Sequence, residues 1–365
     1  MEVYKNVSDL RAGILLKEDV FVNTKYPLIR KDTELSPEHL EVLQAFSVKR
    51  VKVEERVSKK VMPKDEQIPH LDVDAVLDHI PVNMYILRKQ YNETVREYKK
   101  EFIAWRAGKQ PDITKIRELI IPLLEKFISN KRMLTMLNEL SDPEDYIYHH
   151  SIAVGILSAA ISNQMGNSKG ENLQIGLAGT LADCGMAKIN PEIIEKTAFL
   201  TKEEYNEVKK HTLFSVKMIQ SSPLLRQEMK MAILQHHERL DGSGYPRGDK
   251  LDTISTYAQI LAVADVFHAM TSERLYRSKH SPYKVIEMIK EEEFGKFDIK
   301  VVEALHKLIG NLSIGMRVKL TSGEIGEVMF LHRDTPLRPI VKILYSGSTL
   351  DLTNNRSIAI EKIIE

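Results

Sequence analysis

Several features that would narrow the class of a protein are scarce in this chain of 365 residues. Its single cysteine, Cys184, excludes an internal disulfide and is typical of a reducing compartment. No apolar run approaches the roughly 18 residues that a membrane span needs, and the N-terminus lacks the apolar core of a signal peptide. An excess of one charge is also lacking, since 52 basic and 51 acidic residues leave a formal net charge of +1. We therefore expect a cytoplasmic protein of bacterial type, with no membrane partner and no general nucleic-acid binding.

The first 60 residues have a pattern of their own. Apolar and polar positions alternate at Gly13–Leu16, Val20–Val22 and Arg50–Glu54, which predicts strands. A helix is predicted from Ser36, because serine is a favoured N-cap and Pro37 suits the first helical position. Residues 1–60 are thus predicted to form a small α+β domain.

The rest of the chain changes style twice. Residues 61–75 carry two prolines and scattered charges, and are predicted to be a linker. Residues 76–311 show helical spacing of apolar positions throughout, whereas residues 312–365 alternate again and indicate a small antiparallel sheet or barrel. The expected N-cap residues of three helices are Asp112, Asp142 and Thr201. The predicted fold class is mainly α, with an all-helical domain flanked by a small N-terminal α+β domain and a small C-terminal antiparallel β domain.

The most informative segment is residues 236–248, His-His-Glu-Arg-Leu-Asp-Gly-Ser-Gly-Tyr-Pro-Arg-Gly. Imidazole and carboxylate groups are ligands for zinc, iron or manganese, and glycines with a proline indicate a tight loop. Further candidate ligands stand in apolar or helical surroundings, and they are His150, Asp183, His211 and Asp265. A lone histidine or aspartate there is more often a core group or a cap. The adjacent pair His236 and His237 favours a metal site, because buried ionisable groups are paired or metal-bound.

Residues 144–290 resemble the HD-GYP branch of the HD-domain metal-dependent phosphohydrolases. The matching segments are Tyr148–Val154, Leu181–Gly185, His211, His236–Pro246 and Ala264–Arg277. The resemblance implies an all-helical fold whose core binds divalent metal ions, iron or manganese above all. It also implies hydrolysis of cyclic di-GMP, with the metal ions activating water and neutralising the phosphodiester.

The same resemblance assigns roles by position. It implies that the first metal is bound by His150, Asp183 and Asp265. It implies that the second is bound by Asp183 as a bridge, His211, His236 and His237. Asp183 is the expected catalytic residue, and the expected substrate-binding residues are Tyr245, Arg274, Arg277 and His268.

The sequence departs from the family pattern around the first metal. The name-giving His-Asp pair is Ala182-Asp183, and alanine has no lone pair to offer. Met186 stands where a lysine is frequent, and Tyr146 replaces the glutamate of members with three metals. His149 and His268 are conceivable substitutes for the lost ligand; His268 is the better one because it shares a helix face with Asp265. We therefore expect one or two metal ions per chain.

Two functions from different classes remain in view. The first is a cyclic di-GMP phosphodiesterase, weakened by the loss of one ligand. The second is a degenerate domain that binds a nucleotide or a signalling protein partner without turnover. Hydrolysis of another phosphate ester is a weaker third interpretation. The helices within residues 84–139 leave a homodimer open, although a core or linker role is the more frequent one for such a stripe.

Overall fold

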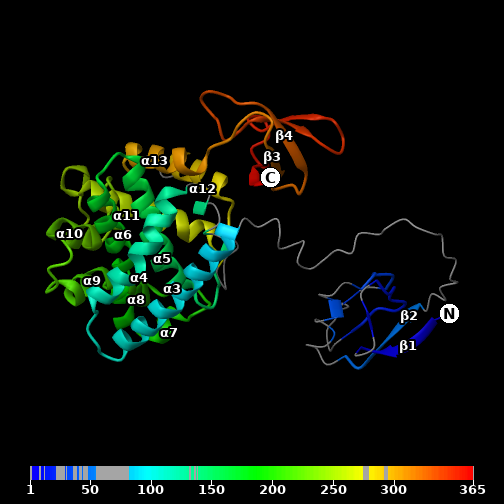
Figure 1. Cartoon of the computed structure of the whole chain (residues 1–365), viewed down its shortest axis with the longest axis horizontal. Helices are drawn as coiled ribbons and strands as arrows, with labels where there is room; N and C mark the ends of the chain where they lie inside the picture. The colour runs from blue at the N-terminus through cyan, green and yellow to red at the C-terminus, as the bar shows by residue number, and fades with distance from the viewer. Residues whose placement is uncertain are drawn as a thin grey trace. The chain divides into compact units, whose positions relative to one another are not determined.

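The structure is a computed structural model in which two compact units, Met1–Ala75 and Val76–Glu365, are distinguished by their internal contacts (Figure 1). Each unit has its own hydrophobic core. The residues that the structure describes are 2–7, 10–11, 13–21, 29, 31–35, 39–40, 43, 48–54, 82–130, 133–134, 137, 139–273, 279–291 and 295–364. The predicted linker, residues 61–75, lies outside them.

The first unit contains a two-stranded antiparallel sheet, in which β1 (Glu2–Asn6) pairs with β2 (Arg50–Glu54). The strand predicted at Arg50–Glu54 is confirmed. The alternation at Gly13–Leu16 gives only isolated bridges, made by Leu15 and Leu16, and these described residues do not form an extended strand. Most of the helix predicted from Ser36 lies outside the described residues.

The second unit is mainly helical, as predicted. Its helices are α3 (Val82–Arg106), α4 (Ile113–Ser129), α5 (Tyr146–Gln164), α6 (Lys169–Leu181), η3 (Cys184–Lys188), α7 (Pro191–Ile194), α8 (Lys202–Lys209), α9 (His211–Ile219), α10 (Gln227–Gln235), η4 (Leu251–Thr253), α11 (Thr256–Thr271), α12 (Pro282–Glu291) and α13 (Ile299–Ile309). Asp112 and Thr201 cap α4 and α8 as predicted. The prediction for Asp142 is wrong: α5 begins at Tyr146 with Asp145 in the N-cap position, and Asp142 accepts a hydrogen bond from the Glu144 N–H in the preceding turn. None of these described helices combines the length and apolarity of a membrane span.

Helix α5 is the centre of the helical core and packs along α6 (Figure 1). Glycines allow the close approach of the two backbones. A Cβ on Gly155 would lie 2.1 Å from Thr180 Oγ1, and one on Gly179 would lie 3.0 Å from Val154 O. Because α5 and α6 form a tight hairpin, the end of α6 returns to the beginning of α5. Asp183, just beyond α6, therefore comes close to His150.

The C-terminal residues form a five-stranded antiparallel sheet, in line with the predicted β pattern. Its strands are β3 (Arg317–Leu320), β4 (Ile325–Phe330), β5 (Ile340–Ile343), β6 (Thr349–Asp351) and β7 (Ile360–Ile364), in the order β6-β5-β4-β3-β7. Alternate side chains, among them Val318, Val328 and Val341, are fully buried on one face. Strand β7 packs against α12, so the sheet continues the core of the helical region.

Candidate metal centre

Asp183 lies between two groups of donor side chains. It follows α6 directly, in the turn that leads into η3. Its Oδ1 lies 3.1 Å from His211 Nε2 and 3.5 Å from His236 Nε2, while its Oδ2 lies 3.5 Å from His150 Nε2. Two ligand atoms that share one ion, each about 2.1 Å from it, are separated by roughly 3 Å. Each oxygen of Asp183 thus lies at about the distance from an imidazole nitrogen that two ligands of one cation have, as expected for a carboxylate that could bridge two cations.

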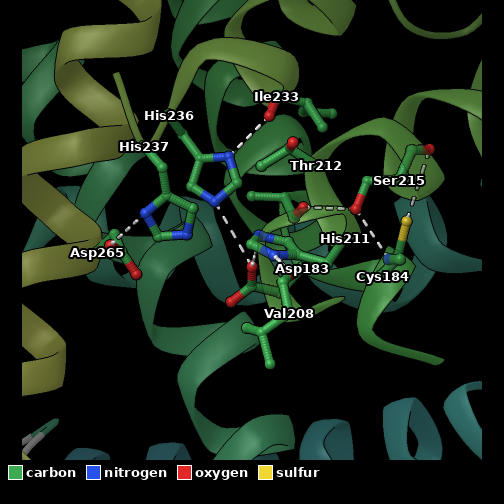
Figure 2. Close-up of polar contacts among 12 residues, drawn as sticks. Asp183, Cys184, Val208, His211, Thr212, Ser215, Ile233, His236, His237 and Asp265 are labelled. Carbon is green, nitrogen blue, oxygen red and sulfur yellow. Dashed lines mark hydrogen bonds and ion pairs between the residues drawn. The ribbon is translucent and has the colours of Figure 1, made fainter. Parts of the chain in front are cut away.

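Each side of Asp183 has its own donor group, and the two groups match those predicted from the sequence. The second group is Asp183, His211, His236 and His237, whose donor atoms lie within 4.8 Å of one another. The first is His150, Asp183 and Asp265, with His150 Nε2 2.9 Å from Asp265 Oδ1. Figure 2 shows the rings of the second group gathered around Asp183, and Asp265 beside His237. Helices α5, α9 and α11 supply His150, His211 and Asp265, whereas Asp183, His236 and His237 lie in the turns directly after α6 and α10.

The tautomers of two histidines fit metal binding. His211 Nδ1 lies 2.7 Å from the carbonyl oxygen of Val208, and His236 Nδ1 lies 2.7 Å from that of Ile233 (Figure 2). A carbonyl only accepts, so each Nδ1 carries a proton, and in the neutral ring that metal binding requires each Nε2 then keeps a lone pair. Both Nε2 atoms are buried without a hydrogen-bond partner of good geometry. Two lone pairs directed at a carboxylate are an arrangement that a cation stabilises, and imidazole with carboxylate suits iron, manganese or zinc.

The charges of the site support this assignment. Burial alone would raise the pKa of Asp183, but its close contacts with the His211 and His236 imidazoles hold that pKa well below its usual range. Burial also opposes ionisation of Asp265, and the His150 contact nevertheless lowers its pKa. The pKa of His237 is well below normal because of burial and the neighbouring His236. Ionised carboxylates beside a neutral His237 are protonation states that metal ligands need, whereas contact with Asp183 outweighs burial and raises the pKa of His211, whose Nε2 proton a cation would displace.

Close backbone packing brings Asp183 to α9. The Gly185 N–H donates to Ser215 Oγ at 2.8 Å, and Ser215 Oγ donates to Ala182 O at 2.7 Å. A Cβ on Gly185 would lie 2.1 Å from His211 O, so only glycine fits between η3 and α9. Ser215 was not predicted from the sequence, since one serine in a helix gives no signal of its own.

The loop that follows His237 is fixed by a buried carboxylate. Glu238 is fully buried, and its two oxygens accept from the backbone N–H groups of Arg247, at 2.7 Å, and Asp249, at 3.0 Å. A Cβ on Gly244 would lie 2.4 Å from Glu238 Cα, so glycine is required where the loop returns. This closure stacks the Tyr245 ring on His237, with ring centres 4.7 Å apart. Glu238 stood in the predicted motif, but its clamping role was not predicted.

The residues that were expected to bind substrate do not all lie beside the two donor groups in the described part of the chain. Tyr245 lies at the site, whereas Arg274 and Arg277 lie outside the described residues. His268 is 1% exposed and its Nδ1 lies 3.0 Å from His150 Nδ1, on the opposite side of that ring from Asp265.

His268 therefore belongs to neither donor group, and this geometry does not support it as a replacement for the lost ligand. Its expected contact with substrate stays a prediction. His149, the other conceivable substitute, contacts Tyr91 instead.

Comparison with known proteins defines the class. An HD domain family model matches residues 124–301, and a model of a KOW domain associated with HD domains matches residues 317–365. The fold resembles that of Bd1817, described as an HDG"Y"P protein from Bdellovibrio bacteriovorus, with a TM-score of 0.51 at 15% identity, covering 84% of this chain and 99% of that one. This is an HD-domain fold with a C-terminal sheet.

Curated relatives narrow the class further. The chain is 34% identical over 255 residues to a cyclic di-GMP phosphodiesterase of Thermotoga maritima, covering 67% of this chain and 68% of the relative. It is 32% identical over 242 residues to a cyclic di-GMP phosphodiesterase of Pseudomonas aeruginosa, covering 66% of this chain and 58% of that one. The chain belongs to the HD-GYP family. The P. aeruginosa relative extends well beyond the matched region.

Proposed function

We propose that this protein is a metal-dependent phosphodiesterase that hydrolyses cyclic di-GMP or a related cyclic dinucleotide. The arrangement of donors on both oxygens of Asp183 carries the proposal, with His211 and His236 Nε2 on one side and His150 Nε2 on the other. Relatives named as cyclic di-GMP phosphodiesterases support the substrate class.

The proposed roles of the side chains follow from their positions. Asp183 would bridge two cations, with His150 and Asp265 completing the first site and His211, His236 and His237 the second. When bound, iron or manganese ions would activate a water molecule and neutralise the phosphodiester. Tyr245 closes one side of the site; burial raises the pKa of its phenol, so the hydroxyl keeps its proton and can donate a hydrogen bond to a phosphate oxygen. Arg274 and Arg277 are proposed phosphate contacts on the strength of the motif alone.

The test is turnover by the full-length protein. Protein purified without oxygen is assayed for metal content and incubated with cyclic di-GMP and iron(II) or manganese(II). We expect linear dinucleotide or GMP from the wild type and none from Asp183→Ala, because that variant loses the bridge for both cations and several kcal/mol of stabilisation from each. Product no higher than in Asp183→Ala would refute the proposal.

Ala182 favours a second candidate, a domain that binds the nucleotide without hydrolysing it. The residue is 3% exposed and offers a methyl group where the family motif has an imidazole, so the first site keeps three protein donors against four in the second. Nucleotide binding in calorimetry without product, and one metal ion per chain, would support this candidate. Activity gained by Ala182→His but not by Ala182→Leu would then identify the missing donor as the cause.

A further inference from the structure

A histidine that binds a metal ion through one ring nitrogen needs a hydrogen-bond partner at the other, and the two proposed metal sites supply this partner differently. In the second site, the backbone carbonyls of Val208 and Ile233 hold the Nδ1 protons of His211 and His236. His150 lies inside α5, where the backbone carbonyls are engaged by the helix itself. Its Nδ1 instead meets side chains.

Two side chains lie within hydrogen-bond distance of His150 Nδ1. They are His268, through Nδ1 at 3.0 Å, and Tyr146, through its hydroxyl at 3.0 Å. His150 is 5% exposed and His268 1% exposed, so water does not compete freely for these atoms. Beyond His268, Ser272 Oγ lies 3.1 Å from His268 Nε2, and Ser141 Oγ donates to Ser272 Oγ at 3.4 Å.

The direction of this chain of hydrogen bonds decides whether His150 can bind a metal ion. If His150 Nδ1–H donates to His268 Nδ1, and His268 Nε2–H donates to Ser272 Oγ, then His150 Nε2 keeps its lone pair toward Asp265 and Asp183. The reverse direction places the proton on His150 Nε2, where it points at Asp265 Oδ1, 2.9 Å away. Metal binding requires the first direction.

We propose that His268 is a positioning residue that accepts the Nδ1 proton of His150 and so prepares Nε2 for the first metal ion. His268 would thus act on His150 as the backbone carbonyls act on the histidines of the second site, by accepting the Nδ1 proton. The Tyr146 hydroxyl fixes the tautomer less well, because it can donate as readily as it accepts. The inference rests on the proposed metal site, and through it on the proposed function, but it concerns metal affinity and not turnover.

The proposal is tested by titrating the full-length protein with manganese(II) in the absence of nucleotide and measuring the binding by calorimetry. For His268→Leu we expect one of two manganese sites to weaken about 10- to 100-fold, the usual cost of losing a group that orients a ligand, while the other site is unchanged. In His268→Asn the amide Oδ1 takes the place of Nδ1, so we expect manganese affinity within about threefold of wild type. In His268→Gln the amide oxygen lies further out, so we expect a loss of affinity close to that of His268→Leu.

His149→Leu is the matched control, since His149 is the neighbouring buried histidine of α5 and contacts Tyr91 instead of the metal centre. Unchanged affinity in His268→Leu would overturn the proposal, as would loss in Tyr146→Phe without loss in His268→Leu. If the leucine variant does not fold, the comparison of asparagine with glutamine decides.

The same titration separates this inference from the proposed function. Wild-type protein that binds two manganese ions without hydrolysing cyclic di-GMP contradicts the function and leaves the inference standing. Wild-type protein that binds fewer than two overturns the inference.

Discussion

Individual residues in this site act mostly by what they hold in place. Glu238 is not one of the predicted metal ligands, yet both of its oxygens accept backbone N–H groups of the loop that carries Tyr245. Hydrogen bonds from backbone N–H groups to a buried carboxylate are among the stronger ones in proteins. The position of Tyr245 against His237 thus depends on the side chain of Glu238.

We predict that Glu238→Gln loosens this loop. The amide keeps one acceptor oxygen and presents a donor to the second N–H, so one buried hydrogen bond is lost, at a cost of about 1.5–3 kcal/mol. Hydrogen exchange measured by mass spectrometry is expected to accelerate at the amides of Arg247 and Asp249. Glu228→Gln, an exposed change on α10, is the control and leaves the exchange unchanged; equal protection in both variants would contradict the clamp.

At the scale of elements, the helices are joined by close packing and by ion pairs such as those of the buried Glu101 carboxylate. Glu101 on α3 is 5% exposed and accepts from Lys115 of α4 at 2.6 Å and from Lys109 at 3.3 Å. The Lys115 hydrogen bond outweighs burial and lowers the pKa of Glu101. A carboxylate whose pKa is lower in the folded than in the unfolded state stabilises the protein above its unfolded pKa.

We therefore predict a specific acid sensitivity. The contribution of Glu101 is fully present at neutral pH and above about pH 4.3, the ordinary value for glutamate, and is lost as the pH falls through its lowered folded value. Glu101→Gln should reduce the free energy of unfolding by about 1.5 kcal/mol or more at pH 7, and should lose less stability than wild type on acidification. Urea unfolding between pH 7 and pH 3 measures this. Glu118→Gln, exposed on α4, should follow the wild-type curve; parallel curves for Glu101→Gln would refute the assignment.

At the scale of the second unit, a largely buried ion pair attaches the C-terminal sheet to the helices. Arg338 binds Glu287 of α12 through two hydrogen bonds of 2.7 and 2.6 Å, and donates to the carbonyls of Leu352, Asn355 and Ile358. The side chains of Arg338 and Glu287 are 11% and 12% exposed. This guanidinium therefore organises the segment before β7 and its contact with α12.

Arg338→Leu is expected to destabilise the protein by about 3–5 kcal/mol, because it leaves Glu287 buried without its partner. Thermal unfolding and limited proteolysis near residues 352–358 provide the measurement. The double variant Arg338→Leu/Glu287→Leu should cost less than the two single changes added together, since it removes the unpaired charge. Strict additivity would show that the pair does not couple, and Arg333→Lys, at an exposed position, serves as the control.

The sequence by itself determined the mainly helical class, the C-terminal β pattern and the family. Periodicity is a local property, so Leu87, Tyr91 and Val95 indicate α3 without knowledge of its neighbours. The motif around His236 likewise carries its chemistry in a short stretch. Local patterns were less reliable at boundaries: Gly13–Leu16 forms only bridges, and Asp142 caps a turn outside α5.

Tertiary structure alone decided which atoms face each other. The sequence motifs and the family that they resemble identified the donors, but the two-sided position of Asp183 depends on the α5–α6 hairpin and on the fit of Gly185 against α9. Helical spacing placed His268 on the face of Asp265, yet it did not reveal that His268 meets the outer nitrogen of His150. The physical reason is that a hydrogen bond depends on ångström-scale distance and orientation. His150 and His268 are more than a hundred positions apart, so packing sets their relative orientation and the local sequence does not.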